Sequence, residues 1–358
     1  MSERNPFSGD ADAAWLALRT EAIIDPALPI VDPHHHLWVR EGNTYLLPEL
    51  LADLGSGHNL VATVFAECHS MYRPDGPPEL RSLGETEFVT GIAAMSASGT
   101  FGPARACAAM FGNADLTLGA RVEPVLEAHL KASGGRFRGI RFSTAWHPDE
   151  KVRSIAPRAA MLADPTWREG FARLGRLGLS FDAWIYHPQL SELADLAAAF
   201  PDVTIVLNHV GSPILGGPYA GRRDEVFAAW SAGIAGVARH PNVYVKLGAL
   251  PIRLPGHGGG GRDTPPGSEE VAEACGPGSR PASSGSDRTA RCSRAISRCR
   301  SAGAATRWSG TRSSASLPPR PPTRRPRCSP ARRGAHTGWP EPYVRNVPPL
   351  TWIVCPVT

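Results

Sequence analysis

Between residues 28 and 247, short runs rich in β-branched residues alternate with longer amphipathic segments. This alternation is typical of parallel strands joined by helices, because a parallel connection must run back along the whole sheet. Seven runs are predicted as strands, at residues 29–32, 60–67, 89–94, 137–142, 180–186, 203–208 and 242–247. Four segments between them are predicted as helices, at residues 118–132, 167–177, 189–199 and 223–238.

The strand count and the placement of polar side chains favour an α/β fold of the (β/α)₈ TIM-barrel type. Barrels gather functional side chains at the carboxyl ends of their strands, whereas an open doubly wound sheet uses one switch point and a glycine-rich first turn. The chain shows no such turn. Polar residues instead follow most predicted strands: His34, His36, Glu67, His69, Arg141, His187, His209 and Lys246. One strand of eight is missing, so we expect a barrel that is incomplete after its seventh strand.

The composition changes near residue 274. Residues 275–358 contain 15 Arg, no Lys and two acidic residues, a net charge of +13, which leaves −8 for the preceding residues out of a total of +5. Five of the seven cysteines also follow residue 274, and the periodic apolar pattern stops there. We therefore predict a barrel domain at residues 1–274 and an irregular basic tail, rich in Arg, Pro and Ser, at residues 275–358.

The tail has three interpretations. It is a disordered basic segment, a segment that binds a polyanion through phosphate contacts, or an out-of-frame translation of the last part of the barrel. Regrouping its codons by one base makes Ser279, Ser283 and Ser286 apolar at helical spacing and ends a restored strand in Glu-Ser-Asn-Phe-Pro. Because helix and strand signals return together, we favour a one-nucleotide frame change near Ala274–Cys275.

Several other protein classes are disfavoured. The N-terminus has no basic-then-apolar leader, and no apolar run approaches the roughly 20 residues of a membrane helix. The cysteines form no paired framework, which suits a reducing compartment. We therefore expect a cytoplasmic protein without a membrane partner, and we do not expect nucleic acid to be the ligand of the barrel. A homo-oligomer is compatible with the sequence.

Three consecutive histidines, His34, His35 and His36, follow directly after Pro33 at the end of the first predicted strand, residues 29–32. Alternate side chains of an extended segment point the same way, so His34 and His36 share one face and His35 points away. Two neutral imidazoles on one face can hold a divalent cation, with zinc or manganese best matched to nitrogen ligands. We predict His34 and His36 as metal ligands; the alternative is a polar strand end with incidental histidines.

The segments at residues 32–38 and 208–211 together resemble the amidohydrolase superfamily. The most similar branch is the amidohydrolase-2 group of sugar lactonases and pyrone-dicarboxylate lactonase-like hydrolases. Further segments that carry the resemblance are residues 65–69, 137–142, 182–189 and 245–248. The resemblance covers about residues 28–274, and it implies a TIM barrel with a divalent metal at the carboxyl ends of its strands.

The resemblance also implies roles for residues after the later strands. His187 matches a histidine after the fifth strand and is assigned as a third metal ligand or a catalytic contact to substrate. His209 matches the sixth-strand histidine and is assigned as a catalytic residue that polarises the substrate. Arg141, Glu67 and His69 are assigned to substrate binding. The alternatives are a backbone-bonded His187, an Arg141 in a surface ion pair, and a Glu67–His69 pair that is satisfied internally.

Three further residues receive weaker assignments. Lys246 is expected near the metal or paired with Glu67, Cys68 is expected to be a small buried residue, and Arg138 is expected to be structural. The family usually supplies the aspartate that acts as a base after the eighth strand, and neither that strand nor that acid is recognisable here. The general base is therefore unassigned.

These assignments predict a metal-dependent hydrolase. Its substrate would be a small-molecule lactone or related carboxylic ester, attacked by metal-activated water. A metal-dependent decarboxylase of the same superfamily is the alternative enzyme. A polyanion-binding protein that uses the tail, and an inactive truncated product, are alternatives of another kind.

Overall fold

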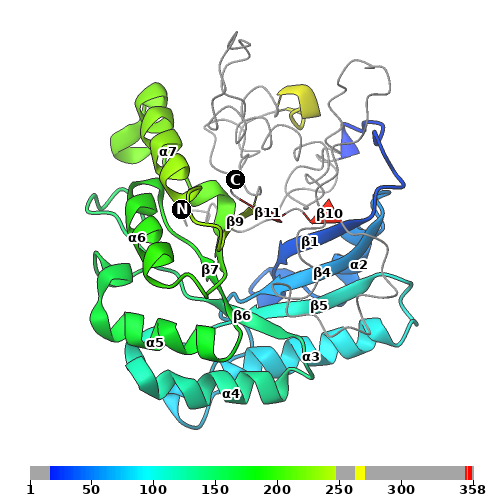
Figure 1. Ribbon diagram of the computed structural model, residues 1–358. Coiled ribbons are helices and arrows are strands. Elements are labelled where there is room, and N and C mark those ends of the chain that lie inside the picture. The colour runs from blue at the N-terminus through cyan, green and yellow to red at the C-terminus, as the bar shows by residue number, and fades with distance from the viewer. Residues whose placement is uncertain (1–16, 247–262, 271–350, 353, 357–358) are drawn as a thin grey trace.

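The computed structural model describes residues 17–246, 263–270, 351–352 and 354–356. Its main sheet is curled and contains seven parallel strands in chain order (Figure 1). These are β1 (Ile30–His35), β4 (Leu60–Ala66), β5 (Arg105–Gly112), β6 (Phe137–Arg141), β7 (Ser180–Ala183), β8 (Ile205–Leu207) and β9 (Val243–Lys246). The fold is thus α/β and of the incomplete barrel type, as predicted.

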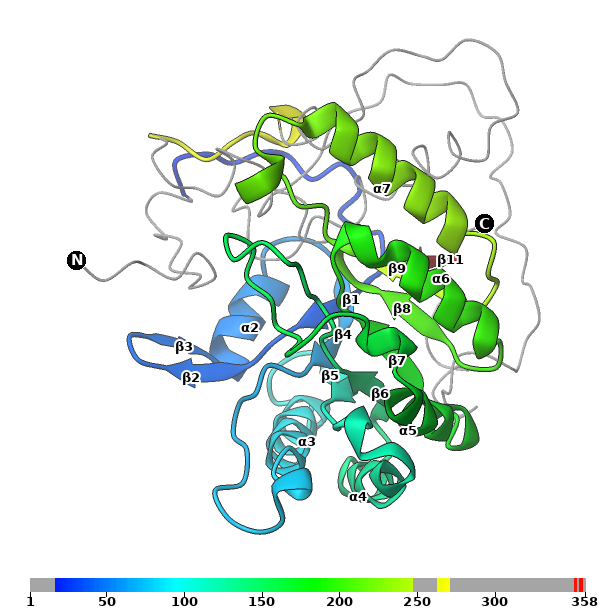
Figure 2. The same ribbon diagram turned by 90° about the vertical axis from the view of Figure 1, so that its left-hand side faces the viewer.

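Helices cover the outer face of the curled sheet (Figure 2). They are α2 (Leu47–Leu54), α3 (Leu83–Ala97), α4 (Glu123–Ala132), α5 (Pro165–Arg176), α6 (Leu190–Ala199) and α7 (Arg223–Val237). Short 3₁₀ turns lie at Pro78–Leu80, Leu116–Val122, Met161–Ala163, His187–Gln189, Asn208–Gly211 and Gly217–Tyr219, and a small hairpin is formed by β2 (Trp38–Arg40) and β3 (Asn43–Tyr45). No helix in the described ranges is long and apolar enough to cross a membrane.

The hydrophobic core lies between the sheet and these helices. Trp167 and Phe171 of α5 are fully buried and pack at ring-centroid distances of 5.5 and 5.2 Å against Phe181 of β7. A separate small cluster of Val31, Val64, Ala109 and Phe111 comes from β1, β4 and β5. Alternate residues of each strand therefore face the helices, and the residues between them face the inside of the curl.

Two short strands near the end of the chain pair with the outermost of the seven strands. β10 (Thr351–Trp352) is parallel to β1, and β11 (Val354–Pro356) is antiparallel to β9. Both edges of the seven-stranded sheet are thus partly covered. The rest of the predicted tail lies outside the described residues, so the out-of-frame hypothesis and the domain boundary stay predictions.

The strand predicted at residues 89–94 is wrong, because this segment lies inside α3. Val89, Thr90 and Ile92 suggested a strand, but Val89 instead packs its side chain into the core as part of the helix. The true third strand of the barrel is β5, which the sequence analysis missed. β5 contains four Ala or Gly residues among eight, so its composition lacks the β-branched signal although most of its side chains are buried.

Candidate active site

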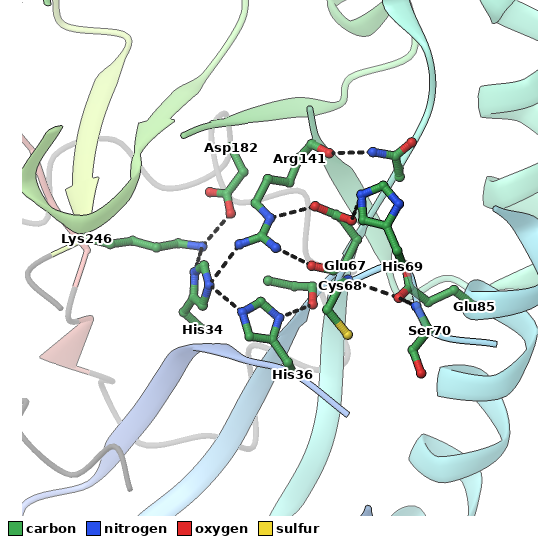
Figure 3. Close-up of polar contacts among 12 residues, drawn as sticks. His34, His36, Glu67, Cys68, His69, Ser70, Glu85, Arg141, Asp182 and Lys246 are labelled. Carbon is green, nitrogen blue, oxygen red and sulfur yellow. Dashed lines mark hydrogen bonds and ion pairs between the residues drawn. The ribbon is translucent and has the colours of Figure 1, made fainter. Parts of the chain in front are cut away.

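The histidine pair lies at the carboxyl end of β1. β1 reaches His35, three residues beyond its predicted end, and its register against β4 shifts between Asp32 and His35. Pro33 has no N–H to donate to the sheet, which suits a local irregularity of this kind. The His34 amide donates to Asp32 Oδ1 at 3.0 Å. His34 and His36 then face each other with their Nε2 atoms 3.3 Å apart (Figure 3).

The tautomer of His36 follows from its contact with the neighbouring strand. Its Nδ1 lies 2.7 Å from the carbonyl oxygen of Ala66 in β4, and a carbonyl can only accept. Nδ1 therefore carries the proton, and Nε2 keeps a free lone pair. Burial lowers the pKa of His36 and of His34 well below the usual imidazole value, and the positive charges of Arg141 and Lys246 lower both pKa values further. Both rings are thus neutral, as a metal ligand must be.

The spacing of the two Nε2 atoms is that of two ligands of one metal ion. Ligand nitrogens about 2.0–2.1 Å from a tetrahedral ion lie about 3.3–3.4 Å apart, and the observed separation is 3.3 Å. Within the described part of the chain, no group of three or more His, Cys, Asp or Glu side chains is arranged to hold a metal. The pair therefore has the spacing of two metal ligands, and the described residues supply no complete site.

Arg141 reaches the pair from the end of β6. Its Nε donates to Glu67 Oε1 at 2.8 Å, its second terminal nitrogen donates to the Glu67 carbonyl oxygen, and its first lies 3.2 Å from His34 Nε2. Arg141 and Glu67 are only 5% and 2% exposed. Burial alone would lower the pKa of Arg141, but the Glu67 carboxylate raises it above its usual value. The alternative of a surface ion pair is therefore wrong, because this pair is buried.

Lys246 reaches the opposite side of His34 from the end of β9. Its Nζ donates to Asp182 Oδ2 at 2.7 Å and lies 3.2 Å from His34 Nδ1. Burial lowers the pKa of Lys246, although Asp182 opposes this shift. Lys246 thus pairs with Asp182 of β7 and not with Glu67. Sequence reasoning assigned Asp182 no role, although its position one residue before the end of a strand could have suggested one.

We call these six residues the strand cluster: His34, His36, Glu67, Arg141, Asp182 and Lys246. A neutral imidazole has a single lone pair, so His34 accepts from only one of the two flanking cations at a time. A metal on Nε2 would take that lone pair and place the proton on Nδ1. Lys246 would then keep Asp182 as its acceptor.

His69 lies two residues after Glu67, in a loop that is hydrogen-bonded to α3. Its Nε2 lies 3.4 Å from Glu67 Oε2, and its backbone is left-handed, with φ of 61°. Glu85 of α3 accepts hydrogen bonds from the amides on both sides of His69, those of Cys68 at 3.0 Å and Ser70 at 2.8 Å. The structure thus brings Glu67 and His69 together, and the side chain of His69 is 67% exposed at the surface of the site.

His209 lies on a left-handed turn that follows β8. Four consecutive residues have positive φ: His209, Val210, Gly211 and Ser212, at 51°, 49°, 74° and 44°. A β-branched residue such as Val210 rarely adopts this conformation, and left-handed backbone costs roughly 1–2 kcal/mol per non-glycine residue. Trp230 Nε1 of α7 donates to the Val210 carbonyl at 2.6 Å and holds the turn. The turn places the His209 ring 4.8 Å from the His34 ring.

His187 belongs to a second group, the loop cluster of His147, His187 and Tyr219. The Ile214 amide donates to His187 Nδ1 at 3.2 Å, and the Tyr219 ring lies 5.1 Å from the His187 ring. Tyr219 Oη is also 3.2 Å from His147 Nε2. Burial, with a contribution from His147, lowers the pKa of His187 to about 4. Since Nδ1 accepts, Nε2 of the neutral ring carries the proton and can donate; the metal-ligand assignment stays a prediction.

Three other residues that were considered from the sequence, His35, Cys68 and Arg138, can also be located. His35 faces away from His34 and His36, with Nε2 2.8 Å from Thr63 Oγ1 and 3.7 Å from Cys107 Sγ. Burial raises the pKa of Cys68 to about 12, with Glu85 and Glu67 contributing, so this thiol is a poor nucleophile. Arg138 donates to the carbonyl of Phe137 at 3.1 Å.

A model of the amidohydrolase family matches residues 31–279. The match spans well over half of the chain and includes every residue of the strand cluster. This chain belongs to the amidohydrolase family. The resemblance stated from the sequence is thereby confirmed, and the chain is an amidohydrolase-family enzyme. The match ends close to residue 274, where the composition changes.

Individual relatives share between 23% and 32% identity with parts of this chain. A protein of Sinorhizobium fredii is 31% identical over 247 residues, which are 62% of this chain and 73% of that protein. An L-fucono-1,5-lactonase of Burkholderia ambifaria is 32% identical over 108 residues, 28% of this chain and 35% of the lactonase. The structure of a Burkholderia multivorans amidohydrolase with bound zinc has 23% identity over 69% of this chain and 78% of its own, with a TM-score of 0.49.

Proposed function

We propose that this amidohydrolase-family enzyme hydrolyses a small-molecule lactone or related carboxylic ester and uses a divalent metal, zinc or manganese, held in part by His34 and His36. The observation that carries the proposal is the 3.3 Å spacing of the two Nε2 atoms, with the lone pair of His36 fixed by Ala66. When bound, such a metal polarises an ester carbonyl and lowers the pKa of its water.

The side chains around the pair supply binding and orientation. Arg141 places one terminal nitrogen beside His34 while Glu67 fixes the rest of its guanidinium, so it can donate to the carbonyl oxygen of an ester without moving. His209 lies against His34 and would orient the substrate from the opposite strand. His69 sits at the surface beside Glu67, where it can contact the part of the substrate farthest from the pair.

His187 is proposed to act as a donor. Its protonated Nε2 can hydrogen-bond to a substrate oxygen while Ile214 fixes the ring. No carboxylate among the described residues is hydrogen-bonded to Nε2 of His34 or His36, and the region of the predicted eighth strand lies outside them. The base that accepts the proton from water is thus not assigned.

Arg141 and Lys246 are each paired with a carboxylate of the chain, and this favours a lactone over a substrate that is decarboxylated. A substrate carboxylate that is lost as carbon dioxide must first be bound, and Arg141 and Lys246 are already paired with Glu67 and Asp182. An uncharged ester makes no such demand. The Burkholderia ambifaria relative, a lactonase by name, agrees with this choice over the short region that it shares.

The test is metal content together with hydrolysis. The chain should be dialysed against zinc or manganese and assayed for bound metal and for release of acid from a lactone panel. The double variant His34→Ala/His36→Ala should lose both, whereas His240→Ala, beyond α7, should lose neither. Stoichiometric metal in the double variant would refute the ligand assignment. Release of carbon dioxide from aromatic acids, without lactone hydrolysis, would favour the decarboxylase alternative.

A further inference from the structure

The loop that carries His69 has an unusual backbone. His69 and Met71 are both left-handed, with φ of 61° and 54°. This conformation is unfavourable for residues other than glycine, so other contacts must hold the loop in place. The side chain of His69 is 67% exposed, and its Nε2 lies beside the buried carboxylate of Glu67. The contacts that restrain the loop therefore decide where an accessible imidazole lies at the edge of the site.

Glu85, in the first turn of α3, supplies the main restraint. One of its carboxylate oxygens accepts from the amides of Cys68, at 3.0 Å, and Ser70, at 2.8 Å, which flank His69 (Figure 3). Glu85 is 1% exposed, and its other oxygen has no hydrogen-bond partner among the described residues. Burial and the charge of Glu67 raise the pKa of Glu85 to about 7, although the two amides oppose this shift. A carboxylate in such surroundings is unfavourable in itself, and its contacts are directed to the backbone around His69.

The start of α3 also contacts the loop through its backbone. The Arg73 amide donates to the Arg81 carbonyl at 2.9 Å. A Cβ atom at Gly84 would collide with the carbonyl oxygen of Met71 and would lie 2.8 Å from the Arg73 nitrogen. The loop therefore packs directly on the helix at Gly84, and a side chain at this position would displace the loop.

We propose that Glu85 is a positioning residue, which holds His69 through the Cys68 and Ser70 amides at the place where the imidazole binds the substrate. The proposal rests on the proposed function, in which His69 contacts the substrate, and it adds a residue that acts without touching the substrate. Because Glu85 acts through His69, loss of either side chain removes the same contact. A merely structural Glu85 would affect stability and leave substrate binding unchanged.

The test is a double-mutant cycle on KM for γ-gluconolactone, measured above the pKa of Glu85. His69→Ala and Glu85→Leu should each raise KM by about 3- to 10-fold, the value of one hydrogen bond, and leave kcat unchanged. The double variant should have the KM of either single variant, because the contact is already lost. Glu85→Gln keeps an oxygen that accepts from both amides, so it should restore most of the wild-type KM. Effects that multiply in the double variant would overturn the proposal.

A second pair of variants moves the loop and leaves both Glu85 and His69 in place. Gly84→Ala should raise KM as Glu85→Leu does, because the added methyl group displaces the loop at Met71. Gly91→Ala is the matched control, since it lies in the same helix with open space around it, and it should leave KM unchanged. A wild-type KM in Gly84→Ala would contradict the proposal.

Hydrogen exchange tests the restraint without catalysis. The Cys68 and Ser70 amides should exchange slowly in the wild type and in Glu85→Gln, and at least about 10-fold faster in Glu85→Leu. Ser96→Ala should leave these two amides protected, because it removes contacts to Ala104 and Ala106 at the other end of α3.

Equal exchange of the two amides in the wild type and in Glu85→Leu would refute the role of Glu85. Failure of the wild type to hydrolyse any lactone would refute the proposed function instead. The exchange rates would then still decide whether Glu85 holds the backbone around His69.

Discussion

The strand cluster and the loop cluster both surround histidines, but they hold them in different ways. In the strand cluster, sheet register places charged side chains opposite each other, and each cation has a buried carboxylate. In the loop cluster, His147, His187 and Tyr219 are joined by uncharged contacts between the segments that follow β6, β7 and β8. The strands thus hold buried charged pairs, whereas the loops hold uncharged hydrogen bonds. Substitutions in the strand cluster should therefore lower the free energy of unfolding more than substitutions in the loop cluster.

The largest effect is expected at the Lys246–Asp182 pair. Asp182→Leu leaves the Lys246 ammonium buried without its carboxylate, so the free energy of unfolding should fall by about 3–5 kcal/mol. Asp195, which pairs with Arg168 and is 69% exposed, is the matched control, and Asp195→Leu should cost less than about 1 kcal/mol. Urea unfolding measures both. The double variant Asp182→Leu/Lys246→Met should regain part of the loss; no recovery would show that the charge is not the cause.

A smaller effect is expected at the left-handed turn. Trp230→Phe removes the donor to the Val210 carbonyl and should lower the free energy of unfolding by about 1–2 kcal/mol. Because the turn carries His209, kcat should also fall. Trp38→Phe, which removes a donor to Asn43 in the small hairpin, should leave kcat closer to the wild type. A variant with wild-type kcat would show that the strained turn does not depend on Trp230.

The loop cluster predicts a pH dependence. The pKa of His187 is lowered from 6.5 to about 4 in the folded chain, so the unfolded chain binds a proton there first as the pH falls. Stability should therefore decline between about pH 6.5 and pH 4 and change no further below that range through this residue. His187→Asn should flatten this decline in urea unfolding measured at several pH values. An identical slope in the variant would mean that other groups dominate.

The smallest effect is expected within the loop cluster itself. Tyr219→Phe removes the hydroxyl at 3.2 Å from His147 and should change the free energy of unfolding by about 0.5–1 kcal/mol, because the group is only partly buried. Thermal unfolding at neutral pH measures the change. A fall in the free energy of unfolding as large as that for Asp182→Leu would contradict the expected difference between the two clusters.

The sequence predicted the parts of the site that depend on strand periodicity. His34 and His36 were placed on one face because side chains alternate in an extended segment, and their contact at 3.3 Å agrees. The Asp182–Lys246 pair could not be predicted, since it depends on which strands lie two apart in the sheet. β5 was missed because its alanines carry little strand signal, and the turn at His209 was missed because nothing local favours a left-handed valine.

The origin of the tail at residues 275–358 is a separate question that the sequence raises. Its composition predicts a frame change near Ala274–Cys275, and this can be tested without any structure. Resequencing across these codons, with the intact mass of the native protein, distinguishes the two cases. A corrected reading frame would restore the region of the eighth strand, but its Glu-Ser-Asn-Phe-Pro segment would place Asn where the family usually has Asp. A mass equal to that of the 358-residue chain would show that the tail is real and would refute a sequencing error as the source of the frame change.

The contact between Lys246 and His34 joins residues 212 positions apart in the chain. It joins β1 and β9, the first and last of the seven parallel strands, so it requires the sheet to curl far enough to bring β9 toward β1. Long-range closure of this kind is slow, because the loop entropy must be lost before the contact forms. The candidate active site thus depends on the contacts that span the largest part of the chain. Recovery of activity during refolding would time the closure of the sheet, later than any signal from its helices.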